Sequence, residues 1–192
     1  MLSSIHPLGE RARGNRWAVT VGAFTLGAAA GGALVGGLLG FVGSALTIRD
    51  EIALIVIGGL ALLAGGLDLL GVRALGPSRQ VNERWIGNLR GTVYGFGFGS
   101  QLGAGIATFV VTWGVWVVLA AEFVSGSPVS GAIIGGVFGV GRAIAPLAAG
   151  WIDRPSRLTR FNGALARLAR PVHLMAGSAT AFLGILAVTQ GV

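Results

Sequence analysis

The chain alternates long hydrophobic runs with short polar segments. No charged residue lies between Trp17 and Leu46 or between Gly91 and Ala121, stretches of 30 and 31 residues. Three further runs each hold one charged residue or histidine, namely Asp68 in 52–72, Arg142 in 123–152 and His173 in 171–192. All five runs exceed the ~20 apolar residues that cross a ~30 Å hydrocarbon core. The pattern predicts an all-α integral membrane protein with five transmembrane helices, at about 17–46, 52–72, 92–121, 129–151 and 171–191.

Composition and charge strengthen this prediction and orient the helices. Charged residues make up 11% of the chain, against ~25% in a typical soluble domain, and the mean hydropathy is +0.78. All 14 basic residues are arginines. Outside the runs they cluster before the first, between the second and third, and between the fourth and fifth, whereas the other two loops hold only Arg49. By the positive-inside rule, we expect residues 1–16 to be a cytoplasmic segment and the C-terminus to face outward.

The segment 154–170 differs from the runs because it is both basic and amphipathic. Its apolar residues recur at helical spacing, and arginines occupy the other faces. We expect a cytoplasmic amphipathic helix on the membrane surface, with its arginines against anionic lipid headgroups. A solvated basic loop is the alternative interpretation.

Glycines recur every four residues within three of the runs. In a membrane this small-xxx-small spacing lets two helix backbones approach closely. We therefore predict that three sets pack helices together: Gly32, Gly36 and Gly40; Gly95, Gly99 and Gly103; and Gly131, Gly135 and Gly139.

The glycine-rich stretch from Arg90 to Gly105, RGTVYGFGFGSQLGAG, allows two further interpretations. A nucleotide-binding glycine loop would need a preceding strand and a following soluble helix, and here the stretch opens a hydrophobic run instead. The second interpretation is a break in the membrane helix. The first and third runs exceed one crossing, and each glycine weakens a helix by up to about 1 kcal/mol, so we predict either a break or a strong tilt in both.

The order of these features resembles the membrane domain of the DsbD/CcdA thiol-reductant conductors, which belong with LysE-type exporters to a wider set of small transporters. The resemblance starts near residue 15 and follows five stretches: RWAVTVGAFTLGAAAGGALVGGLLGFVGSAL, IALIVIGGLALLAGGLDLLG, an arginine-rich loop, GTVYGFGFGSQLGAGIATFV, and SGAIIGGVFGVGRAIAPLAAG with a final short helix. It implies that this chain corresponds to helices two to six of the family's six.

Two departures from that family change the expected function. The family's first helix, with one catalytic cysteine, has no counterpart here. The second catalytic cysteine would fall within Ser100 to Gly105, where this chain reads SQLGAG, and the chain contains no cysteine at all. The resemblance therefore implies the fold without the reaction, unless another chain supplies both cysteines.

Four polar residues within the runs are candidates for a functional site. A charge at the bilayer centre costs at least ~2.5–3.5 kcal/mol, so Arg142 and Asp68 need an explanation. They would pair if the second and fourth helices were adjacent; alternatively, Arg142 extends to the interface and Asp68 simply ends its helix. Ser100 and Gln101 would line a cavity at a break, or form hydrogen bonds between helices.

The leading hypothesis is a permease-like conduit for a small polar or anionic solute, with these four residues in its pathway. The alternative is a membrane-embedded accessory or structural subunit that a partner chain or a second copy completes. A cysteine-free relative that assists thiol-redox conduction is a third possibility.

The sequence gives no indication of an enzyme. It shows no nucleophile with a base and no cluster of metal ligands, so we predict no catalytic residue, no cofactor and no metal. Glu122 and His173 lie at the ends of runs, where we expect them only to mark boundaries. The expected partners are membrane lipids and either another copy or another membrane subunit, not nucleic acid, and the expected location is a prokaryotic plasma (inner) membrane.

Overall fold

The computed structural model describes residues 5–46, 48–76, 89–106, 110 and 112–191. Every secondary-structure element within these residues is a helix, which confirms the predicted all-α class. The elements are α1 (Pro7–Ala12), α2 (Trp17–Gly43), α3 (Asp50–Leu69), α5 (Gly91–Gly103), α6 (Gly114–Val124), α7 (Pro128–Arg142), α8 (Ile144–Ala148), the short 3-10 helix η1 (Ala149–Trp151) and α9 (Pro155–Gly191). Most of the arginine-rich loop between the second and third runs, at 77–88, lies outside the described residues.

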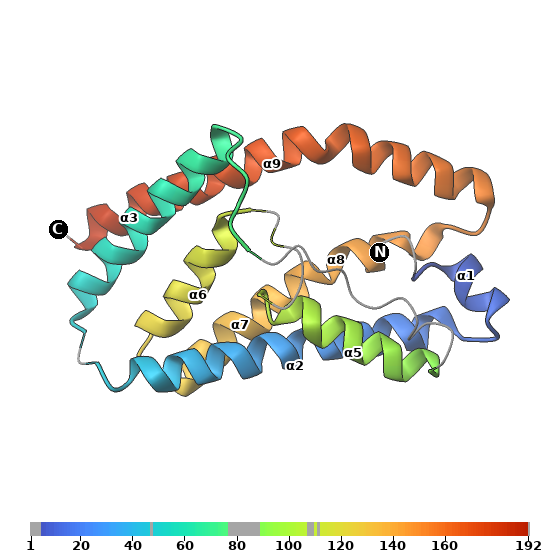
Figure 1. Cartoon of the computed structure of the whole chain (residues 1–192), viewed down its shortest axis with the longest axis horizontal. Helices are drawn as coiled ribbons and strands as arrows, with labels where there is room; N and C mark the ends of the chain where they lie inside the picture. Colours follow the sequence, from blue (N-terminus) through green and yellow to red (C-terminus); the bar gives the residue numbers. More distant parts are fainter. Residues whose placement is uncertain (1–4, 47, 77–88, 107–109, 111, 192) are drawn as a thin grey trace.

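Helix α2 is the centre of one packing unit, with α5 and α7 along two of its sides (Figure 1). Gly95 of α5 lies against Thr20 and Gly103 lies against Ala28, so α5 runs parallel to α2. Helix α7 runs antiparallel to it, since Gly131 lies against Gly36 and the later Gly139 lies against Ala28.

Helices α3 and α9 form a second, antiparallel unit. Gly65 of α3 faces Gly177 of α9, and a methyl group on Gly65 would come within 2.6 Å of the Gly177 carbonyl oxygen. At the far end of this pair, Gly191 lies against the backbone of Glu51. Helix α6 contacts α2, α7 and α3, so it bridges the two units (Figure 1).

The third run is not one continuous helix, so of the two interpretations of its length the break is the one that the described residues show. Helix α5 ends at Gly103 and α6 begins at Gly114. With 13 and 11 residues, the two helices are only ~20 Å and ~17 Å long at ~1.5 Å per residue, short of a ~30 Å hydrocarbon core. Among the described residues, four helical segments are long and apolar enough to cross a membrane: 17–43, 50–69, 128–148 and 155–191. The predicted count of five is therefore not confirmed.

The first and last runs form uninterrupted helices. The length of the first run predicted either a break or a strong tilt. Helix α2 continues over 27 residues, so the prediction of a break in this run is wrong. Helix α9 continues over 37 residues, ~55 Å, and joins the predicted surface segment 154–170 to the predicted final span. Pro171 lies inside α9, where it removes one backbone hydrogen bond, and α9 bends along its length in Figure 1.

Candidate functional site at the break between α5 and α6

The break begins where a glycine ends α5. Ala104 still has helical backbone angles, but Gly105 has a φ of +76°, in the left-handed region that side-chain-bearing residues rarely adopt. The Gly105 N–H donates to the Leu102 carbonyl at 3.2 Å, which closes the last turn as at many helix ends. The stretch AG in SQLGAG therefore ends the helix, and the described residues of the segment before α6, 104–106, 110, 112 and 113, are not helical.

Arg142 meets the carbonyl end of α5. Its Nη1 donates a hydrogen bond to the Gly105 carbonyl oxygen at 3.3 Å, and its guanidinium lies 5.5 Å from the centre of the Phe138 ring. The side chain is half-buried and comes from the last residue of α7. A cation at a helix C-terminus is stabilised by the carbonyls that the helix leaves without partners.

Asp68 meets the amide end of α6. Its Oδ1 accepts a hydrogen bond of 3.0 Å from the backbone N–H of Trp113, the residue that precedes α6. A carboxylate at a helix N-terminus both satisfies an amide and faces the positive end of the helix dipole. The Trp113 indole N–H donates to the Val72 carbonyl at 3.0 Å, and that of Trp116 donates to the Leu75 carbonyl at 2.8 Å. The start of α6 is thus held to the chain that follows α3.

Asp68 has more hydrogen-bonding capacity than this one contact uses. Its side chain is 1% exposed, and its Oδ2 has no hydrogen-bond partner among the described residues. The second contact of Oδ1 is His173 of α9, whose Nε2 lies 3.6 Å away. His173 was expected only to mark a boundary, but it faces a buried carboxylate.

Asp68 and Arg142 do not form an ion pair. Helix α3 packs against α9 and α6, and α7 packs against α2, so the adjacency on which the pairing depended is not present. Each charge instead lies at one end of the same break, the cation at the carbonyl end of α5 and the anion at the amide end of α6. A break inside a hydrophobic run leaves backbone groups that only protein, water or a ligand can satisfy, and these two side chains satisfy one each.

Ser100 and Gln101 lie in the last turn of α5, one turn before the break, and both are half-buried. The Ser100 hydroxyl donates to the Gly97 carbonyl of its own helix at 3.0 Å. The backbone of Ser100 lies directly against Gly31 of α2. The structure therefore brings Ser100, Gln101 and Arg142 to one end of the break and places Asp68 at the other.

All nine glycines proposed for helix packing lie at helix contacts. In each case a methyl group at the glycine would overlap a backbone carbonyl of the facing helix or of the turn before it. The facing residues for α2 are Gly135 at Gly32, Gly131 at Gly36 and Ser127 at Gly40. Gly27 and Gly31 are also four residues apart but were not among the predicted sets, and they make equally close contacts with Phe96 and Ser100.

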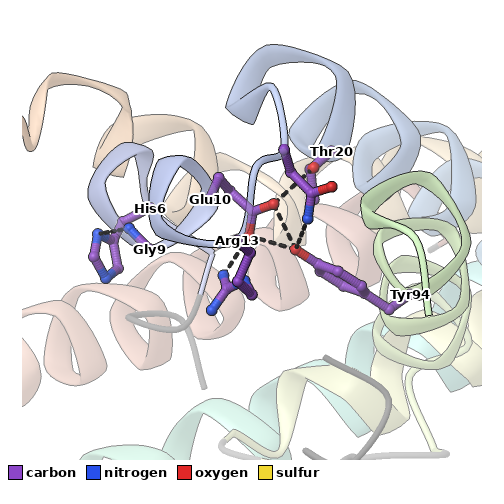
Figure 2. A network of polar contacts seen from close by, with 7 residues as sticks. His6, Gly9, Glu10, Arg13, Thr20 and Tyr94 are labelled. Atoms are coloured by element: carbon purple, nitrogen blue, oxygen red, sulfur yellow. Dashed lines mark hydrogen bonds and ion pairs between the residues drawn. The ribbon is translucent and has the colours of Figure 1, made fainter. Parts of the chain in front are cut away.

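A second polar cluster lies at the start of α2, and sequence reasoning missed it. Figure 2 shows the carboxylate of Glu10, from α1, surrounded by the side chains of Arg13, which follows α1, Thr20 of α2 and Tyr94 of α5. Glu10 is fully buried and accepts hydrogen bonds from the Tyr94 hydroxyl at 2.5 Å and the Thr20 hydroxyl at 2.9 Å. Arg13 forms an ion pair with the same carboxylate at 2.5 Å. Helix α1 thus forms a folded cap on the α2–α5 contact.

The hydrogen bonds to the Glu10 carboxylate favour its ionised form. Burial alone would raise the pKa of its carboxyl, but the hydrogen bonds from Tyr94, Arg13 and Thr20 outweigh that effect and lower the pKa below its usual value of 4.5. The neighbouring His6 also has a lowered pKa, chiefly because of burial and then because of the Arg13 charge. One feature of the sequence could have identified this cluster: Glu10 is the only acidic residue before residue 50.

The surroundings of Glu122 also differ from those that the sequence predicts. It was expected to mark a boundary, but its side chain is 2% exposed and lies between α6, α2 and α7. No group of three or more histidine, aspartate or glutamate side chains in the described part of the chain is arranged to hold a metal ion.

Comparison with family models, with curated proteins and with solved structures finds no match to this chain. The resemblance to the DsbD/CcdA membrane domain therefore stays a prediction.

Proposed function

We propose that this protein is a small permease-like membrane protein in which the break between α5 and α6 forms part of a path for a small polar or anionic solute. The observation that carries this proposal is the interrupted third run, whose two ends are met by Arg142 and Asp68. In secondary transporters, discontinuous helices present their ends and their unwound backbone to solutes near the bilayer midplane. The arginine at one end favours a solute with negative charge or with several hydrogen-bond acceptors.

We further propose five membrane crossings, with α5 and α6 together making the third. Gly95 of α5 lies near the start of α2, and Phe123 of α6 lies against Gly43 at its end. The two short helices therefore follow α2 from one end to the other, which supports one interrupted crossing. The arginine distribution supports a cytoplasmic N-terminus and an external C-terminus, in a prokaryotic plasma membrane.

Anionic lipid is the expected partner of the first half of α9. The side chains of Arg160, Arg167 and Arg170 are all exposed there. Arginines at the end of a membrane helix attract anionic headgroups of the cytoplasmic leaflet, each with roughly 1 kcal/mol near the surface. This half of α9 would extend a membrane helix into the headgroup region.

The alternative function, an accessory or structural subunit completed by another chain or a second copy, has one observation in its favour. The described ends of the break are satisfied from within the protein: the Gly105 carbonyl by Arg142 and the Trp113 amide by Asp68. The Ser100 hydroxyl also bonds to its own helix. A break whose described ends find their hydrogen-bond partners within the protein suits a rigid packing element as well as a solute path.

A flux measurement on purified protein in liposomes tests the proposal. The probes are potassium nitrate and potassium phosphate as anions and xylitol as a neutral polyol, followed by light scattering as the vesicles shrink and swell. We expect faster entry of at least one probe than in protein-free vesicles, and slower anion entry in Arg142→Gln. Arg154→Gln is the matched control, because Arg154 is exposed and distant in sequence from the break. Rates equal to those of protein-free vesicles for all three probes would contradict the proposal.

A further inference from the structure

Glu122 is a buried carboxyl group that is not part of the proposed path at the break. It lies on α6, nine residues after Trp113, which is ~14 Å along the helix from the Asp68 end of the break. Its side chain is 2% exposed, and its Oε2 has no hydrogen-bond partner among the described residues. The sequence predicts a position for Glu122 at a membrane boundary, whereas Gly36, which it contacts, lies seven residues, ~10 Å, inside the end of α2.

Two glycines from two different helices make the space that this carboxyl group occupies. A methyl group on Gly36 of α2 would lie 3.2 Å from the Glu122 carboxyl carbon. A methyl group on Gly135 of α7 would lie 2.9 Å from Oε1. Gly36 also contacts α7 and Gly135 also contacts α2. The carboxyl group of Glu122 therefore packs directly on the place where α2 and α7 cross, which forms the floor of its site.

No basic side chain on the surrounding elements faces this site. Helix α2 carries no charged residue, and neither does α5. On α7 the only charge is Arg142, which bonds to Gly105 two turns beyond Gly135. The charged residues of α3 are at its ends, Asp50, Glu51 and Asp68. The charged residues and the histidine of α9, whose contact with α6 is slight, are Arg157, Arg160, Arg167, Arg170 and His173 in its first half.

Among the described residues, an ionised Glu122 carboxylate would have neither a cation beside it nor a hydrogen-bond donor for Oε2. Burial of an isolated charge of this kind is so costly that the group takes up a proton instead. We propose that Glu122 is a proton-binding site, occupied while α6 packs against the glycines of α2 and α7, and that its proton exchanges with water. Release of the proton would require α6 to separate from that floor, because only then can water reach the carboxylate.

Infrared spectroscopy of the full-length protein in vesicles tests this inference. At neutral pH we expect a protonated-carboxyl band in the wild-type spectrum that is lost in Glu122→Gln and kept in the control Glu51→Gln, whose side chain is exposed. Transfer to D₂O should shift the band, which would show exchange with water. Circular dichroism of Glu122→Gln checks that this nearly isosteric variant folds.

Three results would overturn the proton site. One is a band that is equal in wild type and folded Glu122→Gln, which would mean an ionised Glu122. Another is a band that never shifts in D₂O, which would exclude exchange. The third is loss of the band on addition of Na⁺ at constant pH, which would assign the site to a metal cation. None of these readouts depends on solute flux, so failure of the proton site and failure of the permease proposal are distinguishable.

Discussion

The carboxylate of Asp68, in the last turn of α3, accepts a hydrogen bond of 3.0 Å from the backbone N–H of Trp113, 45 residues later in the chain. This contact fixes where α6 begins. It also explains why a charged residue is retained near the end of an apolar helix: the charge faces the positive end of a helix dipole, in a place where that amide would otherwise have no acceptor.

Loss of the Asp68 side chain should weaken the fold more than loss of its charge alone. We expect Asp68→Ala to lower the free energy of unfolding by about 1–2 kcal/mol, the usual cost of removing a helix N-cap. Asp68→Asn keeps an oxygen that can accept from the Trp113 amide and should cost less. The measurement is unfolding of the detergent-solubilised protein by a denaturing detergent, followed by circular dichroism.

The control for this experiment is Asp153→Ala. Asp153 forms an ion pair with Arg157 at 3.1 Å, and both side chains are about half exposed. Removal of such a surface pair should change stability by less than about 1 kcal/mol. If Asp68→Ala is no more destabilising than Asp153→Ala, the Asp68 contact does not hold α6.

The helix-packing glycines should tolerate no added methyl group, whereas other glycines of the same helices should. Gly135→Ala would overlap the Gly32 carbonyl and push α7 away from α2, at an expected cost of about 1–3 kcal/mol. Gly22→Ala on α2 is the matched control because nothing lies within 4 Å of the added methyl group. It should be neutral or stabilising by up to about 1 kcal/mol. Equal effects of the two variants in the same unfolding assay would mean that the glycine spacing is unrelated to packing.

Acid should loosen the cap that α1 forms on the α2–α5 contact. Because the folded-state pKa of Glu10 is lower than its usual value of 4.5, this carboxylate stabilises the fold above about pH 4.5. That stability is lost as the pH falls through the lower, folded-state pKa. The melting temperature of the wild type should therefore decrease more steeply than that of Glu10→Gln as the pH falls below about 4.5. Parallel curves for the two proteins would show that Glu10 is not linked to folding.

His6 should act in a separate and higher pH window. Its Nδ1 accepts a hydrogen bond from the Gly9 amide at 3.2 Å, which only an unprotonated ring nitrogen can do. Its pKa is lowered from 6.5 in the folded protein, so acidification from about pH 6.5 down to the lowered pKa should cost stability. We expect His6→Gln to remove this part of the acid dependence and leave the Glu10 part in place.

Reporter fusions test the proposed number of crossings and their orientation. A fusion at the C-terminus, after Val192, should report an external location, and one in the loop after Asp153 should report the cytoplasm. The physical basis is the arginine asymmetry together with an interrupted third crossing. A cytoplasmic signal from the C-terminal fusion would rule out five crossings with this orientation.

The helical class, the approximate positions of three long apolar helices and the glycines at helix contacts could be predicted because each depends on a local pattern, whereas α9 begins at Pro155, 16 residues before the predicted span. A run of about 20 or more apolar residues with few charges can be recognised directly in the sequence. The limit of α5 was harder to predict: Gly105 ends the helix through a positive φ, yet Gly99 and Gly103, four and eight residues from Gly95, lie inside it. Composition alone does not distinguish a glycine that packs a helix from one that ends it.

The partners of the buried charges could not be predicted, since they depend on which helices lie side by side. Asp68 and Arg142 were assigned to a possible pair, but α3 packs on α9 and α6 rather than on α7. Glu10 and Tyr94 are 84 residues apart, and nothing in either local sequence indicates that α1 folds back over α5. Glu122 lies at the end of a hydrophobic run, where a residue at a membrane boundary is expected. Only its three-dimensional contact with Gly36 and Gly135 shows that it is buried.

Cysteine labelling at the last turn of α5 tests the proposed path most directly. The chain has no cysteine, so Ser100→Cys and Gln101→Cys each introduce a single thiol. In membrane vesicles, Ser44→Cys and Ser156→Cys serve as exposed controls for the two sides, and Leu38→Cys serves as a control for an exposed apolar position. If water reaches the break, a membrane-impermeant thiol reagent should label Ser100→Cys or Gln101→Cys from one side only, and should not label Leu38→Cys. Complete protection of both positions in the folded protein, while Ser44→Cys and Ser156→Cys react, would contradict the path and favour the accessory subunit.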